Sequence, residues 1–296
     1  MLFDYSHTKK IALFLTSVFL LSACASDDKE PVNPLDKIVF KHEGMQRCYE
    51  GWRNELNWQT LDDVTYLSCG KNSIDTVEGI EQLPELRYFS ISFTAITALD
   101  LSHNTKLTEL NIIGNLGLFE LDLSNNTELE DITINHNALR SLDISNLPKL
   151  TNANLMLNNL EQVEVYNSPN IQILWFSYNK LTQLDVFEIT NLQWLSVYNN
   201  QLDLLDVSYN LKLKDLDITY NNFTTIDINA NTELTTLRLA GNKLTAIDLD
   251  NNVYLQVVDA RDNPWSGEMI NYLLGLDRIT TICLTNTTPS IAICGG

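Results

Sequence analysis

LTTLRLAGNKLTAIDLDNNVY, from Leu234 to Tyr254, is one of a series of near-copies that fill most of this chain. The copy before it, LKDLDITYNNFTTIDINANTE, runs from Leu213 to Glu233. Both fit the pattern LxxLxLxxNxLxxLDLxxNxx, which recurs from Leu107 to Asn263. A unit this short cannot bury its own apolar face, so it must stack on its neighbours. The repeat therefore predicts a solenoid.

The copies keep a constant register, with unit starts 21 or 22 residues apart. The starts are Val64, Leu86, Leu107, Leu129, Leu150, Ile171, Leu192, Leu213, Leu234 and Leu255. The ninth position is Asn in every unit except the second, which has Thr94. These residues are Asn72, Asn115, Asn137, Asn158, Asn179, Asn200, Asn221, Asn242 and Asn263. A buried Asn carries two donors and a carbonyl, so we expect this column to bind backbone groups of adjacent turns.

Each unit also has two similar halves. The apolar residues at its first, fourth and sixth positions return at the eleventh, fourteenth and sixteenth positions. This alternation predicts extended chain with one buried face. We expect a strand from the first half, a short second strand or extended segment from the second, and few helices. Leu or Ile recurs in register between the Asn residues, which disordered tracts lack, so we do not interpret the repeats as an Asn-rich disordered tract.

This pattern resembles the bacterial leucine-rich repeats, most closely the short 21-residue class called IRREKO repeats, and is similar to internalin-like proteins. The resemblance implies a leucine-rich-repeat arc or coil, right-handed, with a concave parallel β-sheet. It implies a structure of mostly β and loop with a short helical N-cap. Family members usually serve in surface adhesion or recognition, and the family fixes architecture better than it fixes a ligand.

The start of the chain resembles a bacterial lipoprotein signal. Two lysines, Lys9 and Lys10, precede an apolar run that is too short and too early to span a membrane. The run ends in Leu21-Ser22-Ala23-Cys24, which resembles a lipobox. By that resemblance, residues 1–23 are a signal peptide and Cys24 carries lipid, whose acyl chains bind the membrane. An ordinary signal peptide with a chance Cys is the alternative.

We expect residues 24–38 to form a polar tether. No Asp follows Cys24 directly, and the acidic cluster after it resembles surface-export signals of some Gram-negative lipoproteins. The expected location is therefore the bacterial cell envelope, at the outer membrane with surface exposure. Beyond the tether we expect an N-terminal cap at 39–63, repeats at 64–263 and a C-terminal cap at 264–296.

Four further cysteines lie near the two ends of the repeat region. An exported chain with an even number of cysteines predicts disulfides. The ends of a solenoid expose core and need caps, so we expect the pairs Cys48–Cys69 and Cys283–Cys294. Cys48 lies in a stretch with helical spacing. Four buried free thiols are the alternative, and a metal site is disfavoured because no CxxC motif or His cluster accompanies them.

Composition excludes several classes of function. The chain has 19 Lys and Arg against 38 Asp and Glu, a net charge of −19. This charge disfavours nucleic acid and anionic lipid head groups as partners. The sequence has no P-loop, GxGxxG, HExxH or GxSxG motif, and its four His residues are scattered. We therefore assign no catalytic residue, metal or cofactor, and expect a protein that is not an enzyme.

The acidic residue that follows Leu in the second half of the unit forms a column. Its members are Asp100, Asp122, Asp143, Glu164, Asp185, Asp206, Asp227 and Asp248. One interpretation is that this column binds calcium, which prefers several oxygen ligands. The favoured reading is that each carboxylate lies in solvent and binds an N–H of its own turn.

The strand positions expected to point outward carry the candidate binding site. They place Trp175, Tyr178, Trp194, Tyr198 and Tyr220 on three consecutive units. Exposed Trp and Tyr in a cluster are typical of binding hot spots, although such rings can also pack on one another without a ligand. Beside them, three residues share one column and predict an alternating-charge ladder: Asp217, Arg238 and Asp259.

These features predict an envelope-anchored, non-catalytic recognition or adhesion protein that binds a protein or polysaccharide on its concave face. Two alternatives remain open. One is a solenoid glycan-active enzyme, for which Asp215, Asp217 and Asp259 are the candidate carboxylates. The other is a structural envelope protein without a ligand.

Overall fold

The computed structural model describes residues 32–71, 73–287 and 290–295, with backbone alone from residue 286 onward. The folded unit begins at Asn33, inside the stretch expected to be the tether. Here Pro34–Lys37 forms a 3-10 helix, η1, and Leu35 is fully buried. The predicted signal peptide and lipidated Cys24 lie outside the described residues.

The N-terminal cap is built around one helix. This helix, α1, spans Glu43–Leu56, where His42 accepts the Gly44 N–H and Asn57 ends the helix in a left-handed conformation. Met45 and Tyr49 are buried beneath it. Two short 3-10 helices, η2 (Leu61–Asp63) and η3 (Ile80–Gln82), lie before and after the first strand. The disulfide Cys48–Cys69 joins α1 to that strand, with the two Cα atoms 5.8 Å apart, which confirms this predicted pair.

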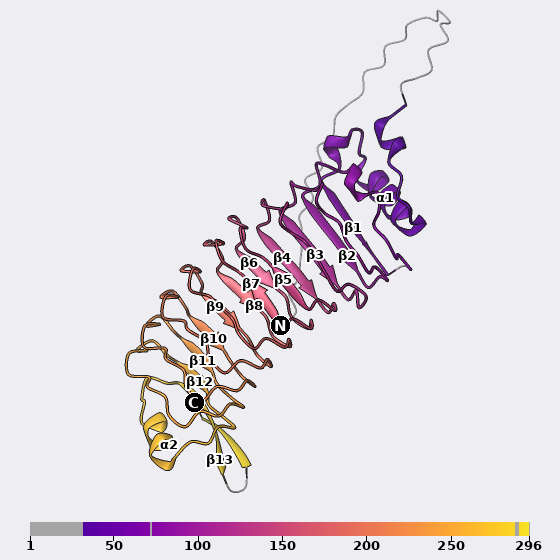
Figure 1. The fold of residues 1–296 in the computed structure, drawn as a ribbon. Helices are drawn as coiled ribbons and strands as arrows, with labels where there is room; N and C mark the ends of the chain where they lie inside the picture. The colour runs from indigo at the N-terminus through magenta and orange to yellow at the C-terminus, as the bar shows by residue number, and fades with distance from the viewer. Residues whose placement is uncertain (1–31, 72, 288–289, 296) are drawn as a thin grey trace, which may run out of the picture. The chain divides into compact units, whose positions relative to one another are not determined.

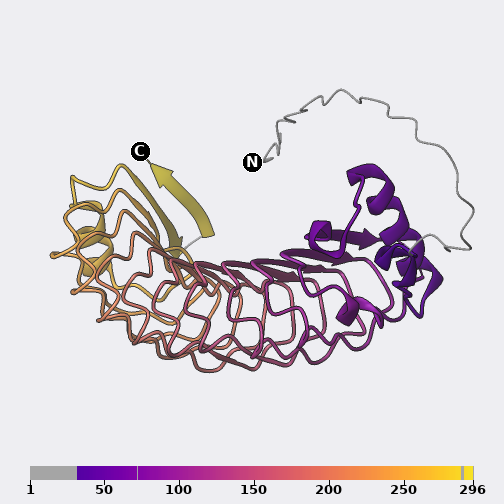
Figure 2. The same ribbon diagram turned by 90° about the horizontal axis from the view of Figure 1, so that it is seen from above.

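The repeats form one parallel sheet with one strand from each unit. Its strands are β1 (Tyr66–Gly70), β2 (Tyr88–Ser92), β3 (Glu109–Ile113), β4 (Asp131–Asn135), β6 (Asn152–Asn154), β8 (Ile173–Trp175), β9 (Trp194–Ser196), β10 (Asp215–Asp217), β11 (Thr236–Arg238) and β12 (Val257–Asp259). Figure 1 shows these strands stacked in chain order. Figure 2 shows the stack curving with the sheet on its inner side. The predicted solenoid with a concave parallel sheet is confirmed.

The second halves of the units run on the far side of the core. Most are extended without pairing, but β5 (Ser141–Asp143) and β7 (Gln162–Glu164) form a separate two-stranded parallel sheet. Between the two sides, the apolar positions of both halves are buried along the whole stack. This matches the expectation of short strands or extended segments on that side.

The C-terminal cap closes the other end of the sheet. A short helix, α2 (Gly267–Leu274), begins at Ser266, whose side chain accepts the Met269 N–H. After it, β13 (Thr281–Thr287) pairs in parallel with β12 and antiparallel with β14 (Ser290–Gly295). The register of this hairpin sets Cys283 opposite Cys294, and Cys283 is disulfide-bonded. The side chain of Cys294 lies outside the described part, so the Cys283–Cys294 pair remains a prediction.

The Asn column forms a continuous polar ladder inside the stack. Asn200 donates from Nδ2 to the carbonyl oxygens of Phe176 and Val197, both at 3.0 Å, and its Oδ1 accepts the Leu181 N–H at 3.0 Å. The Phe176 carbonyl also accepts from Asn179. Each such carbonyl thus accepts hydrogen bonds from the Asn of its own unit and from the Asn of the next unit. Thr94, the exception in the column, donates its hydroxyl to Asn115.

The acidic column caps turns, as the favoured reading expected. Seven of its eight carboxylates accept the backbone N–H two residues further on; Asp206, for example, accepts from Ser208 at 2.9 Å. No group of three or more His, Cys, Asp or Glu side chains that could hold a metal ion occurs among the described residues. In the same part of the chain, no helix is long and apolar enough to cross a membrane.

Candidate functional site

The parallel register sets outward side chains of successive strands side by side in rows. Strand pairing places Trp175 next to Ser196, Ser196 next to Asp217, and Asp217 next to Arg238. In the neighbouring row, Trp194 of β9 lies next to Asp215 of β10. The sheet therefore brings the two tryptophans and the charged residues onto one patch of the concave face.

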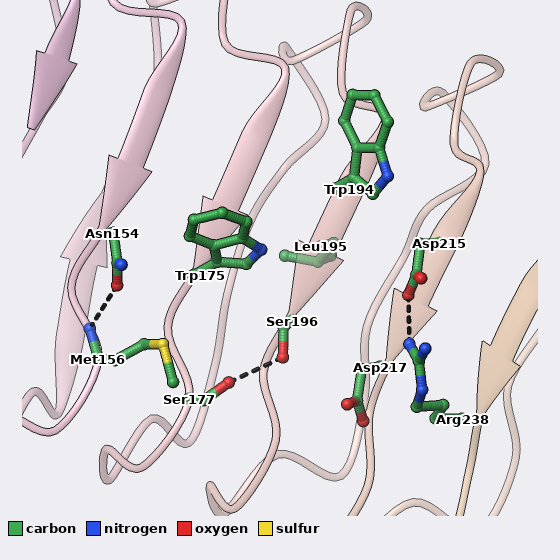
Figure 3. A pocket seen from close by; sticks show the side chains of 10 residues that line it. All are labelled: Asn154, Met156, Trp175, Ser177, Trp194, Leu195, Ser196, Asp215, Asp217 and Arg238. Carbon is green, nitrogen blue, oxygen red and sulfur yellow. Dashed lines mark hydrogen bonds and ion pairs between the residues drawn. The ribbon is translucent and has the colours of Figure 1, made fainter. Parts of the chain in front are cut away.

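A hollow of about 500 Å³ lies in this patch. Figure 3 shows the side chains around it. They are Asn154, Met156, Trp175, Ser177, Trp194, Leu195, Ser196, Asp215, Asp217 and Arg238. Trp175 is 41% exposed and Trp194 is 37% exposed. Both indoles are therefore partly exposed and available to a ligand.

Two serines make room for the hollow. Ser196 ends β9 and Ser177 follows β8, and the two share a hydrogen bond of 2.7 Å between their hydroxyl oxygens (Figure 3). A larger side chain at either position would fill the space between Trp175 and Asp217. Asn154 closes one end, where its Oδ1 accepts the Met156 N–H at 3.3 Å.

The charged side of the hollow carries two carboxylates and one guanidinium. Arg238 Nη1 contacts Asp215 Oδ1 at 2.7 Å. Burial raises the pKa of Asp215 and outweighs the opposite effect of Arg238. Asp217 accepts the Thr219 N–H at 3.0 Å, and within the described part of the chain it forms no ion pair.

The expected alternating-charge ladder is only partly right. Asp217, Arg238 and Asp259 do share one row of the sheet. However, Arg238 pairs diagonally with Asp215, and Asp259 pairs with Arg261 of its own unit at 2.6 Å. A long guanidinium side chain reaches diagonal neighbours as readily as direct ones, so the row does not become a ladder of ion pairs.

The three predicted tyrosines form a strip beside the hollow. Their rings meet edge to face, with centroids 4.8 Å apart for Tyr178 and Tyr198 and 5.6 Å apart for Tyr198 and Tyr220. A hydrogen bond with Tyr178, together with burial, raises the pKa of Tyr198 to about 12. Part of the aromatic cluster thus packs on itself, as the alternative reading expected, whereas both indoles line the hollow.

The tyrosine strip depends on a glycine. Tyr178 and Tyr220 have left-handed backbones, with φ of 58° and 52°. The equivalent residue of the next unit is Gly241, with φ of 66°, and a Cβ there would overlap the Tyr220 ring. The ring of Tyr220 therefore occupies the space that a side chain at position 241 would need. This left-handed turn recurs where the chain leaves most strands.

The sequence predicted the two tryptophans and the charged residues of the hollow, but not the small polar residues that also line it. Ser177, Ser196 and Asn154 carry no chemical signature of binding. Only the place of Ser196 in its row, between Trp175 and Asp217, could have indicated a gap. The second Asn of the repeat pattern was given no role from the sequence: buried Asn residues of this column donate to carbonyls of the preceding unit.

A second hollow lies on the other side of the stack. Its volume is about 710 Å³, and Phe187 and Leu204 lie among four carboxylates on its walls. Two of these carboxylates, Asp185 and Asp206, already cap turns. Phe187 packs on Tyr209, with ring centroids 4.1 Å apart. This hollow is larger than the concave one, but two of its four carboxylates are committed to their own turns.

Comparison with known proteins gives the fold a context. The functional domain of InlJ from Listeria monocytogenes is 36% identical, with a TM-score of 0.68, over 76% of this chain and 49% of that one. A leucine-rich-repeat protein from Leptospira interrogans is 22% identical, with a TM-score of 0.64, over 75% of this chain and 66% of that one. An internalin from Listeria monocytogenes is 23% identical, with a TM-score of 0.52, over 86% of this chain and 94% of that one.

This chain has the leucine-rich-repeat fold. The leucine-rich-repeat solenoid spans about half the length of the InlJ domain. That domain includes a cysteine ladder, whereas the ladder inside this leucine-rich-repeat stack is made of Asn carboxamides. No protein-family model and no curated protein matches the chain.

Proposed function

We propose that this protein is a non-catalytic recognition protein of the bacterial cell envelope that binds a polypeptide or glycan on its concave face. The observation that carries the proposal is the hollow between Trp175, Trp194 and Asp217. Trp and Tyr present a large contact area and lose little side-chain entropy on binding. Two exposed indoles beside a ready-made cavity therefore provide the anchors that a binding surface needs.

The enzyme alternative is weaker. Its candidate carboxylates were Asp215, Asp217 and Asp259, and two of these are held in ion pairs by arginines. A glycosidase needs one carboxyl group to donate a proton and another to act as base or nucleophile. Asp215 has a raised pKa, but its carboxylate is bound to Arg238. Similar internalin-type structures also favour a binding module.

The resemblance of Cys24 to a lipobox cysteine supplies the rest of the proposal. A lipid-anchored solenoid would present its concave face outside the membrane. The alternative of a structural envelope protein without a ligand leaves the two exposed tryptophans without a role.

The proposal is tested with the soluble form from Ala25 onward, on a glycan array and in pull-downs against envelope and host extracts. Trp175→Ala and Trp194→Ala should fold normally, because both side chains point away from the core. Each should weaken binding of a captured ligand by about 2 kcal/mol or more, roughly thirtyfold. Asp143→Asn, on the far side of the core, is the control. If both Trp variants fold and bind that ligand normally, the concave hollow is not the binding site.

A further inference from the structure

The space above Ser196 has two different walls. On one side is the indole of Trp175 and on the other is the carboxylate of Asp217 (Figure 3). These residues are two strands apart, which corresponds to about 10 Å at the usual strand spacing. Ser196 itself is too small to fill the gap, and its hydroxyl is hydrogen-bonded to Ser177.

The charge of these walls is not balanced. Two carboxylates and one guanidinium line the hollow. Arg238 is occupied by Asp215, so Asp217 is left with a single hydrogen bond, from the Thr219 N–H. The hollow therefore carries one negative charge that no residue in the described part of the chain pairs.

A cation fits between the two walls. It is attracted to an aromatic ring when it lies within about 6 Å of the ring centroid, and it forms an ion pair when its nitrogen lies within about 4 Å of a carboxylate oxygen. The sum of these two distances, about 10 Å, matches the spacing of Trp175 and Asp217. The neighbouring indole already holds a cation in this way, since Lys214 Nζ lies 5.9 Å from the ring centroid of Trp194.

We infer that the hollow takes the cationic side chain of a Lys or Arg residue of a polypeptide ligand, seated over Ser196 between Trp175 and Asp217. A neutral sugar could stack on the indoles and donate its hydroxyls to Asp217, but it would leave the charge of that carboxylate uncompensated, which is costly when water is displaced. Another carboxylate at a concave strand position, Glu109 of β3, adds negative charge to the sheet and favours a basic segment. This inference rests on the proposed binding function of the same hollow.

The test measures tryptophan fluorescence of the soluble full chain during titration with acetylated and amidated hexa-arginine or hexalysine. Hexaglutamate and the neutral oligosaccharide cellohexaose serve as comparison probes. Asp217→Asn and Trp175→Ala should each weaken hexa-arginine or hexalysine binding about tenfold. Asp131→Asn is the matched control, because it removes the same charge from the same sheet outside the hollow. It should leave the affinity within about twofold of wild type.

Melting curves of each variant establish that the fold is retained. Equal binding of hexa-arginine to Asp217→Asn, Asp131→Asn and wild type would overturn the inference, because the attraction would then come from the acidic surface as a whole. Displacement of the cationic peptide by cellohexaose, or binding of cellohexaose alone, would overturn it as well.

The failure of this inference differs from the failure of the proposed function. If a captured ligand depends on Trp175 but not on Asp217, and no cationic peptide binds, the inference is wrong and the recognition function stands. If no captured ligand depends on either tryptophan, the recognition function at this hollow is wrong too.

Discussion

Asn200 shows how single residues hold this stack together. Its carboxamide donates to the carbonyls of Phe176 and Val197 and accepts the Leu181 N–H. Because Phe176 O also accepts from Asn179, and Val197 O also accepts from Asn221, the two carbonyls have a second partner. The Leu181 N–H has none of this redundancy, so it is the group that depends most on Asn200.

Asn200→Ala is therefore expected to destabilise the protein by about 1–3 kcal/mol, because it leaves a buried N–H unsatisfied. Urea unfolding followed by circular dichroism measures the change. Asn251→Ala is the matched control, since Asn251 is exposed and hydrogen-bonds only to the Asn229 side chain at 3.2 Å. An unchanged midpoint for Asn200→Ala would contradict the buried-ladder account.

The turn-capping aspartates predict a dependence of stability on pH. Hydrogen bonds from Ser102, Ser124 and Ser208 lower the pKa of Asp100, Asp122 and Asp206. Because the folded-state pKa lies below the unfolded value of about 3.9, this stabilisation is complete above that value. It is lost as the pH falls through the folded-state pKa.

Replacing these three Asp residues by Asn keeps an oxygen acceptor for each turn but removes the titration. The triple variant should therefore lose less stability than wild type when the pH is lowered from 6 to about 2. Urea midpoints across this pH range give the comparison. Parallel pH profiles for the two proteins would show that other carboxyl groups govern the acid response.

At the scale of elements, the link between α1 and β1 is the feature with the clearest energetic consequence. The disulfide Cys48–Cys69 spans 21 residues of chain, and Trp52 Nε1 donates to Ser68 O at 2.7 Å beside it. In the chain-entropy account, a closed loop of this size stabilises by about 3 kcal/mol through the unfolded state.

The double variant Cys48→Ala/Cys69→Ala should lower the free energy of unfolding by about that amount, 3 kcal/mol. Thermal melts of the oxidised wild type and the variant measure it, and both proteins keep Cys283 unchanged. Because the repeats contact only their neighbours, we expect fraying to begin at the N-terminal end. Identical melts would mean that the cap is held by packing alone.

The elements that could be predicted are those whose residues recur in the sequence at a regular spacing. The 21-residue spacing gave the strands, their parallel stacking and the buried Asn column, since each repeated signal averages over ten units. The helical spacing around Cys48 located α1. What could not be predicted depends on side-chain reach: Arg238 lies between Asp217 and Asp259 in its row, but it pairs with Asp215 in the neighbouring row. The gap over Ser196 exists only because small residues meet across strands.

At the scale of the whole molecule, the proposed anchor decides where the concave face acts. Cys24→Ser removes the only thiol that the lipobox resemblance marks for lipid, and acyl chains are expected to provide the membrane affinity. The variant should therefore move from the membrane pellet to the soluble fraction with its fold unchanged. Immunoblots of the separated fractions measure this, with Cys283→Ser as a control for general loss of a cysteine. Full retention of Cys24→Ser in the pellet would rule out the anchor.

The shared carbonyls of the Asn ladder have a consequence for how such a molecule can change in evolution. Each Asn of the ladder uses groups that every unit carries, and it joins its own unit only to the preceding unit. A gene duplication of 21 residues would bring both halves of a new joint with it, so the concave surface could grow by one row at little cost. A unit of 22 residues is also accepted, since Asn137 follows Asn115 by 22 residues and the two remain hydrogen-bonded, but an insertion of a very different length would break the ladder at that point. The number of units can thus change freely, while the length of each unit is confined to 21 or 22 residues.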